Sequence, residues 1–261
     1  ILLATTDPHM ANRYNYNKTY TDTPQYRNDF RGDIDAFVRE HGTKNVYAIC
    51  LGDLTWDIYW YDKGTFYTLE DYRKEIENFP VPYFQVIGNH DYCHKVADDT
   101  ADAQYKAALG PTYYSFNLGR IHYIVLDDMV YKGSNAYSTR IDDRQMEWLR
   151  KDLAATDPAV RDVVVAMHVP TVNGLQTDGS YKKALENFDD FYALFADYNL
   201  TVMSGHWHHA HSVRIGDKAA EYILPAACGT WWYKLLCNDG TPAAFSACTV
   251  NGTSMSYRIV P

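Results

Sequence analysis

The sequence predicts an α/β fold built on a parallel sheet, and two patterns support this prediction. Over the first 90 residues, short apolar runs of strand length alternate with segments whose apolar residues have helical spacing. Strands that alternate with helices pair in parallel, because each helix carries the chain back across the sheet. Each of these strands is also followed by Asp, His or Asn. Ligands bind at the carboxyl ends of strands in open α/β sheets, so we expect a functional site at this edge.

The first five elements set this pattern. Residues 1–6 form a short apolar strand that ends before Pro8, because proline cannot donate a hydrogen bond to a sheet ladder. A helix is expected over residues 28–40, and Gly42 ends it. The strand, helix and strand that follow are expected at residues 46–51, 68–78 and 84–87.

The rest of the chain adds further helices and strands. A hairpin is expected around Gly119, between strands at residues 113–117 and 121–126. Further helices are expected at 101–109, 142–154 and 182–198, and further strands at 163–167 and 200–203. A strand-rich tail begins at about residue 212, with strands at 212–215, 221–224, 245–250 and 254–260. We expect a single domain over 1–261, and the apolar start without Met suggests part of a longer chain.

Composition restricts the class of partner. The net charge is −9, from 24 basic and 33 acidic residues, and an acidic surface disfavours a nucleic-acid polymer as the main partner. No apolar run is long enough to span a membrane. The 23 tyrosines and six tryptophans fit either a Tyr-rich core and surface or a stacking surface for a sugar or base.

Five cysteines are present, and none has the CxxC spacing of a zinc site. Cys50 lies in an apolar run and is expected to be a buried thiol. Cys228 and Cys237 flank a Trp-rich loop and could pair if the protein is exported. Export to the periplasm or cell surface is our expectation, with a cytoplasmic location as the alternative.

Polar residues follow five of the predicted strands and form a pattern typical of a metal site. Carboxylate, amide and imidazole groups together suit first-row transition metals better than calcium. In Asp-x-His and His-x-His, two side chains at a strand end point to the same face. The five blocks are Asp7-Pro8-His9, Gly52-Asp53, Gly88-Asn89-His90-Asp91, His168 and Gly205-His206-Trp207-His208.

These blocks resemble the motifs of the calcineurin-like metallophosphoesterases: D-x-H, G-D-x-x, G-N-H-D/E, a lone H and G-H-x-H. The resemblance covers roughly residues 1–211 and implies a four-layer sandwich, in which helices flank two mostly parallel or mixed β-sheets. Residues 121–153 are also similar to the cyclic-nucleotide-phosphodiesterase-like (Icc-type) branch, of the exported bacterial type. The tail from about Cys228 matches none of the family's motifs.

The resemblance implies a role for each residue of the blocks. Asp7, His9 and His208 would hold one metal ion, and Asn89, His168 and His206 would hold the other. Asp53 would bridge the two ions, which could be divalent or trivalent Mn, Fe or Zn. Two divalent ions outweigh the two ligand carboxylates, so the pocket would be cationic and would suit phosphate. A metal-bound hydroxide would then attack phosphorus.

His90 would donate a proton to the leaving oxygen, and Asp91 would orient its imidazole. Asp57 would be either an acid near the site or a solvated loop residue. Among the other histidines, we expect His41 at the surface and His122 in a structural role. His94, His209 and His211 are expected to neighbour the site without binding metal.

The motifs describe the phosphate end of a substrate, so phosphomonoesters and phosphodiesters both remain open. Loops at residues 10–23, 59–67, 131–140 and 171–181 are expected to select a small phosphoester. The alternative is a non-catalytic metal-binding scaffold of the same fold. A purple-acid-type phosphatase is a third idea, but Gly52-Asp53 lacks the tyrosine ligand of that group's GDxxY block. The oligomeric state stays open.

Overall fold

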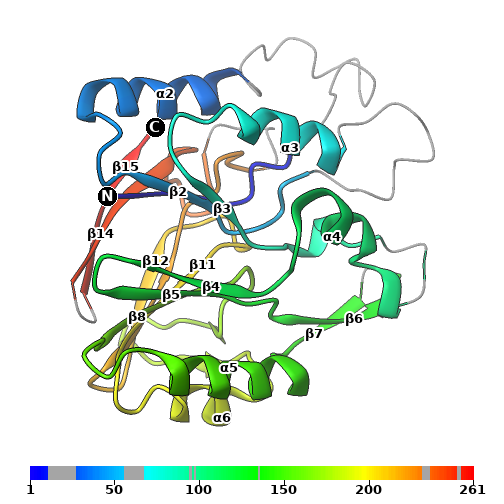
Figure 1. Ribbon diagram of the computed structural model, residues 1–261, viewed down its shortest axis with the longest axis vertical. Coiled ribbons are helices and arrows are strands. Elements are labelled where there is room, and N and C mark those ends of the chain that lie inside the picture. The colour runs from blue at the N-terminus through cyan, green and yellow to red at the C-terminus, as the bar shows by residue number, and fades with distance from the viewer. Residues whose placement is uncertain are drawn as a thin grey trace.

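The computed structural model describes residues 1–10, 28–55, 68–93, 96, 98–134, 136–230, 236–251 and 254–261. Two large mixed sheets pack face to face, and helices cover the outer face of each sheet (Figure 1). The predicted four-layer α/β sandwich is therefore confirmed.

The first sheet has the strand order β15-β14-β1-β2-β3. Its strands are β1 (Leu2–Thr5), β2 (Tyr47–Cys50), β3 (Tyr83–Gln85), β14 (Phe245–Asn251) and β15 (Ser254–Val260). β1, β2 and β3 are parallel, whereas β14 runs antiparallel to both β1 and β15. Helices α2 (Asn28–His41) and α3 (Leu69–Glu77) lie above this sheet (Figure 1).

The alternation of side chains along β1 shows how the layers are joined. Leu3 packs with Ile34 and Phe37 of α2 on the outer face. Leu2 and Ala4 point the other way, into the cluster between the two sheets. A strand that is apolar on both faces therefore lies between two layers, as the short apolar run at the start of the sequence predicted.

The second sheet has the order β12-β13-β11-β8-β5-β4. Its strands are β4 (Tyr114–Leu118), β5 (Ile121–Val125), β8 (Asp162–Ala166), β11 (Asn199–Ser204), β12 (His211–Ile215) and β13 (Ala219–Ile223). The four inner strands are parallel, and the edge strands β12 and β4 are antiparallel to their neighbours. Helices α5 (Asp143–Ala155) and α6 (Phe188–Ala193) cover its outer face, where Leu149 and Phe191 pack on Val163 and Val165.

Two sequence predictions fail, one between β8 and β11 and one between β5 and β8. Residues 182–198 were expected to be one helix, but β10 (Lys182–Lys183) pairs with β9 (Val172–Asn173), and α6 is short. The reason is tertiary, because the amides of Ala184 and Leu185 both donate to the carbonyl of Thr171. The loop expected at 131–140 is instead largely a hairpin of β6 (Met129–Gly133) and β7 (Ala136–Thr139).

The remaining elements lie close to their predicted positions. Helix α4 (Ala103–Leu109) follows the short 3₁₀ helices η3 (Asn89–Asp91) and η4 (Asp98–Thr100). Nearly all of loop 10–23 and all of loop 59–67 lie outside the described residues. In the part of the chain that the structure describes, no helix is both long and apolar enough to cross a bilayer.

All five cysteines are buried free thiols. The expectation for Cys50 is thus confirmed, whereas the suggested pairing of Cys228 with Cys237 is not present.

Candidate metal centre

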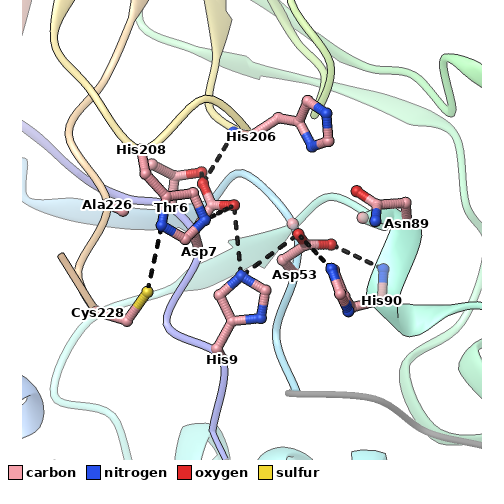
Figure 2. A network of polar contacts seen from close by, with 12 residues as sticks. Thr6, Asp7, His9, Asp53, Asn89, His90, His206, His208, Ala226 and Cys228 are labelled. Atoms are coloured by element: carbon pink, nitrogen blue, oxygen red, sulfur yellow. Dashed lines mark hydrogen bonds and ion pairs between the residues drawn. The ribbon is translucent and has the colours of Figure 1, made fainter. Parts of the chain in front are cut away.

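The carboxyl ends of both sheets meet at one place and bring the predicted ligands together (Figure 2). The first sheet supplies side chains after β1, β2 and β3, and the second supplies them after β8 and β11. All seven predicted metal ligands take part in this cluster: Asp7, His9, Asp53, Asn89, His168, His206 and His208. All are buried except His206, which is partly buried.

One group of ligands surrounds Asp7. Asp7 Oδ1 lies 3.2 Å from Nε2 of His208 and 3.7 Å from Nε2 of His9. The other carboxylate oxygen, Oδ2, accepts hydrogen bonds from Oγ1 of Thr6 at 2.6 Å and from the amide of His206 at 2.9 Å. One oxygen is thus used to hold neighbouring chain segments, and the other points at imidazole nitrogens.

A second group surrounds His168. Nε2 of His168 lies 3.2 Å from Oδ1 of Asn89 and 3.2 Å from Oδ2 of Asp53. A ring nitrogen of His206, a carboxylate oxygen of Asp53 and a ring nitrogen of His168 all lie within 4.8 Å of one another. Asp53 Oδ2 is also 3.5 Å from Nε2 of His9 in the first group. Asp53 therefore lies between the two groups, where a bridging ligand would be needed.

The backbone of the ligands is unusual. Among the described residues, seven non-glycine residues have a positive φ, and five of them are ligands: Asp7 (50°), His9 (41°), Asp53 (54°), His206 (65°) and His208 (51°). Left-handed backbone is uncommon outside glycine, although Asp, Asn and His adopt it more readily than other residues. Such strain costs about 1–3 kcal/mol per residue and gathers at functional sites. The sharp turns aim side chains inward directly after each strand.

Glycines in the motifs permit the close approach of these turns. A Cβ atom added at Gly205 would lie 1.8 Å from Oγ1 of Thr6, and one added at Gly88 would lie 2.1 Å from the amide nitrogen of Asp53. Neither position has room for any side chain. These glycines allow strand ends from different parts of the sequence to touch.

Backbone carbonyls determine which nitrogen of two histidines faces the site. Nδ1 of His168 is 2.7 Å from the carbonyl of Leu51, and Nδ1 of His208 is 2.6 Å from the carbonyl of Gly229. A carbonyl can only accept, so both Nδ1 atoms carry hydrogen, and in the neutral ring each Nε2 would offer its lone pair to a metal ion. This is the usual arrangement of a metal-binding histidine.

The donor set fits a bound metal ion. Asp7 Oδ1 is buried and receives no hydrogen bond from the described residues, although Nε2 of His208 is close to it. Two buried electron-pair donors facing each other need a cation between them. Mixed carboxylate, amide and imidazole ligands suit first-row transition metals. The arrangement therefore supports a dinuclear metal centre.

The electrostatics of the site without metal lead to the same conclusion. Burial lowers the pKa of both His208 and His168, but the carboxylates outweigh it. Asp7 raises the pKa of His208 to about 12, and Asp53 raises the pKa of His168 to about 10. Burial also raises the pKa of the two carboxyls, yet the histidines hold the pKa of Asp7 and of Asp53 well below the usual range. Protons thus occupy positions that metal ions would take.

The other two ligand histidines lack such a proton. Burial lowers the pKa of His9. Burial and the charge of His168 lower the pKa of His206 to about 4. Neutral imidazoles are the form that binds metal, so these two rings need lose no proton first.

His90 lies at the border of the cluster. Its amide donates to Oδ1 of Asp53 at 2.9 Å, and its ring Nε2 is 3.9 Å from Oδ2 of the same residue. The side chain is 15% exposed, whereas that of His168 is fully buried. A ring that is partly open to solvent can reach a substrate.

Asp91 does not have the partner that we expected. Its carboxylate accepts hydrogen bonds from the amides of Gly88 (2.8 Å), Leu54 (3.0 Å) and Thr55 (3.2 Å). None of its hydrogen bonds in the described structure goes to the ring of His90. Asp91 therefore joins the turn after β2 to the turn after β3. Burial and the charge of Asp53 raise its pKa to about 7, against the effect of these amides.

The structure adds residues that sequence analysis missed. The hydroxyl of Tyr137 on β7 lies 3.1 Å from Nε2 of His206, which leaves Nδ1 of that ring for metal. Sγ of Cys228 lies 3.6 Å from Nδ1 of His208. Both residues are distant in sequence from their partners, so no local pattern could have identified them.

Other expectations for single residues have clear outcomes. His122 is structural, because its ring lies between Asn117 and Asp152 at 2.8 and 2.7 Å. His41 ends α2 and is exposed, as expected. Asp57 and His94 lie outside the described residues.

Comparisons with known proteins agree with this geometry. Residues 2–210 match the family described as calcineurin-like phosphoesterase. A curated relative, acid phosphatase type 7 of Danio rerio, is 31% identical over 114 residues. That match covers 43% of this chain but only 25% of the relative's length.

Solved structures with the same fold include three phosphatases or nucleotidases. A dimetal phosphatase from Danio rerio aligns with a TM-score of 0.65 at 13% identity, over 99% of this chain and 95% of that chain. A putative 5′-nucleotidase from Staphylococcus aureus aligns with a TM-score of 0.58 at 14% identity, over 100% and 53%. A purple acid phosphatase from yellow lupin (Lupinus luteus) seeds aligns with a TM-score of 0.57 at 15% identity, over 99% and 51%.

At these identities the structural likenesses establish the fold, and the family match establishes the relationship. The match covers four fifths of the chain and contains every block from Asp7 to His208. The finer similarity to the cyclic-nucleotide-phosphodiesterase-like branch stays a prediction. The chain belongs to the calcineurin-like phosphoesterase family, a family of phosphoric ester hydrolases.

Proposed function

We propose that this protein hydrolyses a small phosphoester with two metal ions, one held by Asp7, His9 and His208 and the other by Asn89, His168 and His206. Asp53 would contact both ions. The observation that carries this proposal is the buried cluster in which Nε2 of His208 faces Oδ1 of Asp7 and Nε2 of His168 faces Oδ2 of Asp53. Two ions bound there would polarise the phosphate and make a water nucleophilic at neutral pH.

The residues of the chain would supply positioning and proton transfer. The carbonyls of Leu51 and Gly229 hold the rings of His168 and His208 in the tautomer that binds metal. Buried walls exclude bulk water from the ligands, which strengthens their attraction for a charged phosphate. His90 borders the ligands and is partly exposed, so its ring can reach the leaving oxygen and donate a proton to it.

The substrate is proposed to be a small phosphoester and not a nucleic-acid polymer. The net charge of −9 would repel a long polyanion, whereas two metal ions would make only the local pocket positive. Monoesters and diesters are both compatible with the ligand set. The metal ions are proposed to be Mn, Fe or Zn, divalent or trivalent, because the ligands mix nitrogen and oxygen donors.

Turnover by protein of known metal content tests this proposal. Metal-stripped protein would be loaded with Mn²⁺ and assayed with p-nitrophenyl phosphate and bis-p-nitrophenyl phosphate. We expect metal-dependent release of p-nitrophenol from at least one ester, and the ratio of the two rates measures the preference for monoester or diester. The matched control is His122→Gln, since His122 is a buried histidine outside the cluster, and it should retain both activity and metal.

A negative result would have a definite meaning. Protein that holds two ions per chain but cleaves no phosphoester would contradict the catalytic proposal. It would favour the alternative, a non-catalytic metal-binding scaffold. Protein that binds no transition metal would contradict both.

Export to the periplasm or cell surface is also a proposal, and its support is compositional. The tyrosine- and tryptophan-rich sequence favours it, whereas the free thiols of Cys228 and Cys237 remove the argument from a disulfide. Fractionation of cells that express the complete gene product tests the location directly. Recovery in the cytoplasmic fraction alone would contradict export.

A further inference from the structure

Two buried carboxylates hold the loop after β8, one at each end. They accept hydrogen bonds from backbone and hydroxyl groups and not from the ring nitrogens that would bind metal. At its start, Oδ1 of Asp128 accepts a hydrogen bond from the amide of His168 at 3.3 Å, and Oδ2 accepts one from the amide of Val169 at 2.9 Å. At its end, Oε1 of Glu221 accepts one from the amide of Thr171 at 2.9 Å. The segment 168–171 is thus fixed at both ends.

Glu221 also reaches a second ligand-bearing segment. Its Oε1 accepts a hydrogen bond from Oγ of Ser204 at 2.8 Å, and its Oε2 accepts one from Oγ1 of Thr171. Ser204 is the last residue of β11 and lies two residues before His206. One carboxylate therefore ties the loop that carries His168 to the turn that carries His206. These are the two histidines proposed for the same metal ion.

The position of Glu221 makes this tie unusual. β13 is an inner strand of the second sheet, and Glu221 pairs with Val202 on β11. Asp128 and Glu221 are both fully buried, and neither has an ion-pair partner among the described residues. On an inner strand, an apolar side chain would be usual at the position of Glu221, because a buried carboxyl group is costly unless hydrogen bonds satisfy its oxygens. Here the donors to the carboxyl oxygens of Asp128 and Glu221 belong to the segments of the candidate metal centre.

We propose that Asp128 and Glu221 form a carboxylate clamp, a pair of positioning residues that fixes His168 and His206 for the metal ion they share. The clamp acts through the backbone and hydroxyl groups of 168–171 and 204, and neither carboxylate touches the ion or the substrate. Glu221 lies beyond the family match, which ends at residue 210. The part of the chain outside the family motifs thus sets the geometry of one metal position. This inference rests on the proposed function for its metal ions.

Metal affinity, measured separately from activity, tests the clamp. The variants are Glu221→Leu, which removes all acceptors at similar volume, and Glu221→Gln, which keeps one acceptor oxygen. We expect Glu221→Leu to weaken the binding of one of the two ions about 10–100-fold, the usual effect of losing a partner that orients a ligand. The other ion, held by Asp7, His9 and His208, should bind as in the unchanged protein. Glu221→Gln should lose less affinity.

Competition with a chelator gives the two affinities, and the absorption spectrum of the Co²⁺-loaded protein reports the geometry of each position. The matched control is His122→Leu, which also replaces a buried polar residue of the second sheet, on β5. Its hydrogen bonds go to Asn117 and Asp152 and to no ligand segment. The control should lower the melting temperature and leave both affinities unchanged.

A folded Glu221→Leu variant that binds both ions with unchanged affinity would overturn the clamp. If Glu221→Leu does not fold, Ser204→Ala removes only the tie to the segment of His206, and Asp128→Asn disturbs only the start of the His168 loop. Each should weaken the same single ion, and unchanged affinity in both would overturn the proposal. Failure of the clamp is separable from failure of the function: unchanged protein that binds two ions but cleaves no ester contradicts only the function.

Discussion

At the scale of single residues, the metal centre depends on turns that most side chains avoid. Five of the proposed ligands have left-handed backbone, and their strain is offset by contacts between segments distant in sequence, such as the bond from the amide of His206 to Asp7. Asp91 also joins turns that are distant in sequence. It sits beside His90 in the sequence, yet its carboxylate holds the amides of Gly88, Leu54 and Thr55.

His90 is the residue whose role is most open to direct measurement. Its ring lies close enough to His9 and Asp53 to bind a metal ion as a third ligand, but it is also partly exposed. His90→Asn should lower kcat by about 10²–10⁴-fold, as expected for loss of a general acid, and leave two ions bound. The loss should be larger for an alkyl phosphate than for p-nitrophenyl phosphate, because a basic leaving group needs the proton more.

Kinetics with both esters and elemental analysis of the variant check this prediction. His209→Asn serves as the control, because His209 packs against Trp207 and is not a proposed ligand. Loss of one ion from His90→Asn would make His90 a ligand and contradict its assignment as a proton donor.

At the scale of elements, segments without motifs hold the motifs in place. The hairpin of β6 and β7 brings Tyr137 to His206. The segment after β13 reaches the turn after β1, where the amides of Ala227 and Cys228 donate to the carbonyls of Thr6 and Asp7. The next carbonyl, that of Gly229, orients His208. Hydrogen bonds from the β6–β7 hairpin and from the segment after β13 therefore position proposed ligands that follow β1 and β11.

The hairpin provides a prediction at this scale. Tyr137→Phe keeps the ring but removes the hydroxyl from Nε2 of His206, so that ring should rotate more freely. We expect the affinity for the ion that His206 shares with His168 to fall about tenfold or more. Tyr131→Phe on the facing strand is the matched control, since Tyr131 stacks on Tyr92 through its ring. Titration of both variants with Co²⁺ measures the difference, and equal affinities would show that the hydroxyl has no positioning role.

At the scale of the whole molecule, an acidic protein encloses a site that needs cations. The net charge is −9, and Asp7 and Asp53 keep their charges although they are buried. In the metal-free protein, protonated His208 and His168 balance them, with pKa values of about 12 and about 10. The ordinary value is 6.5, so these protons stabilise the folded metal-free protein fully below about pH 6.5. That stabilisation is lost as the pH rises through 10 to 12.

Metal binding should therefore release protons. At pH 8 both rings are protonated without metal, and both must be neutral to bind it, so loading two ions should release about two protons. Apparent metal affinity should rise with pH from 6 to 9. Calorimetric titration in buffers of different ionisation enthalpy measures the proton count. Release of no protons at pH 8 would contradict the charge balance described here.

Much of the site followed from local sequence patterns. The types of the candidate ligands, their order and their positions after strands could all be predicted, because strand periodicity and turn residues act over a few residues. Boundaries also held where local signals were strong, as in β15 and α5. Residues 182–198 failed because Ala184 and Leu185 bond to Thr171 in another segment, which overrides helical spacing. The hairpin of β6 and β7 was missed, and its turn contains Gly133 and Ser134, which both have a positive φ.

By itself, the sequence determined the family, the two-sheet sandwich and the set of candidate ligands that the fold brings together. Only the tertiary structure decided which groups position these residues: the side chain of Asp91 at the turns of Asp53 and Gly88, the hydroxyl of Tyr137 at His206, the carbonyl of Gly229 at His208, and the side chains of Asp128 and Glu221 at the loop of His168. The physical reason is that a motif records the residues that meet a substrate or metal. The hydrogen bonds that position them join segments far apart in the chain, 117 residues for His168 and Leu51 and 199 residues for His206 and Asp7, and no local pattern specifies such a pairing.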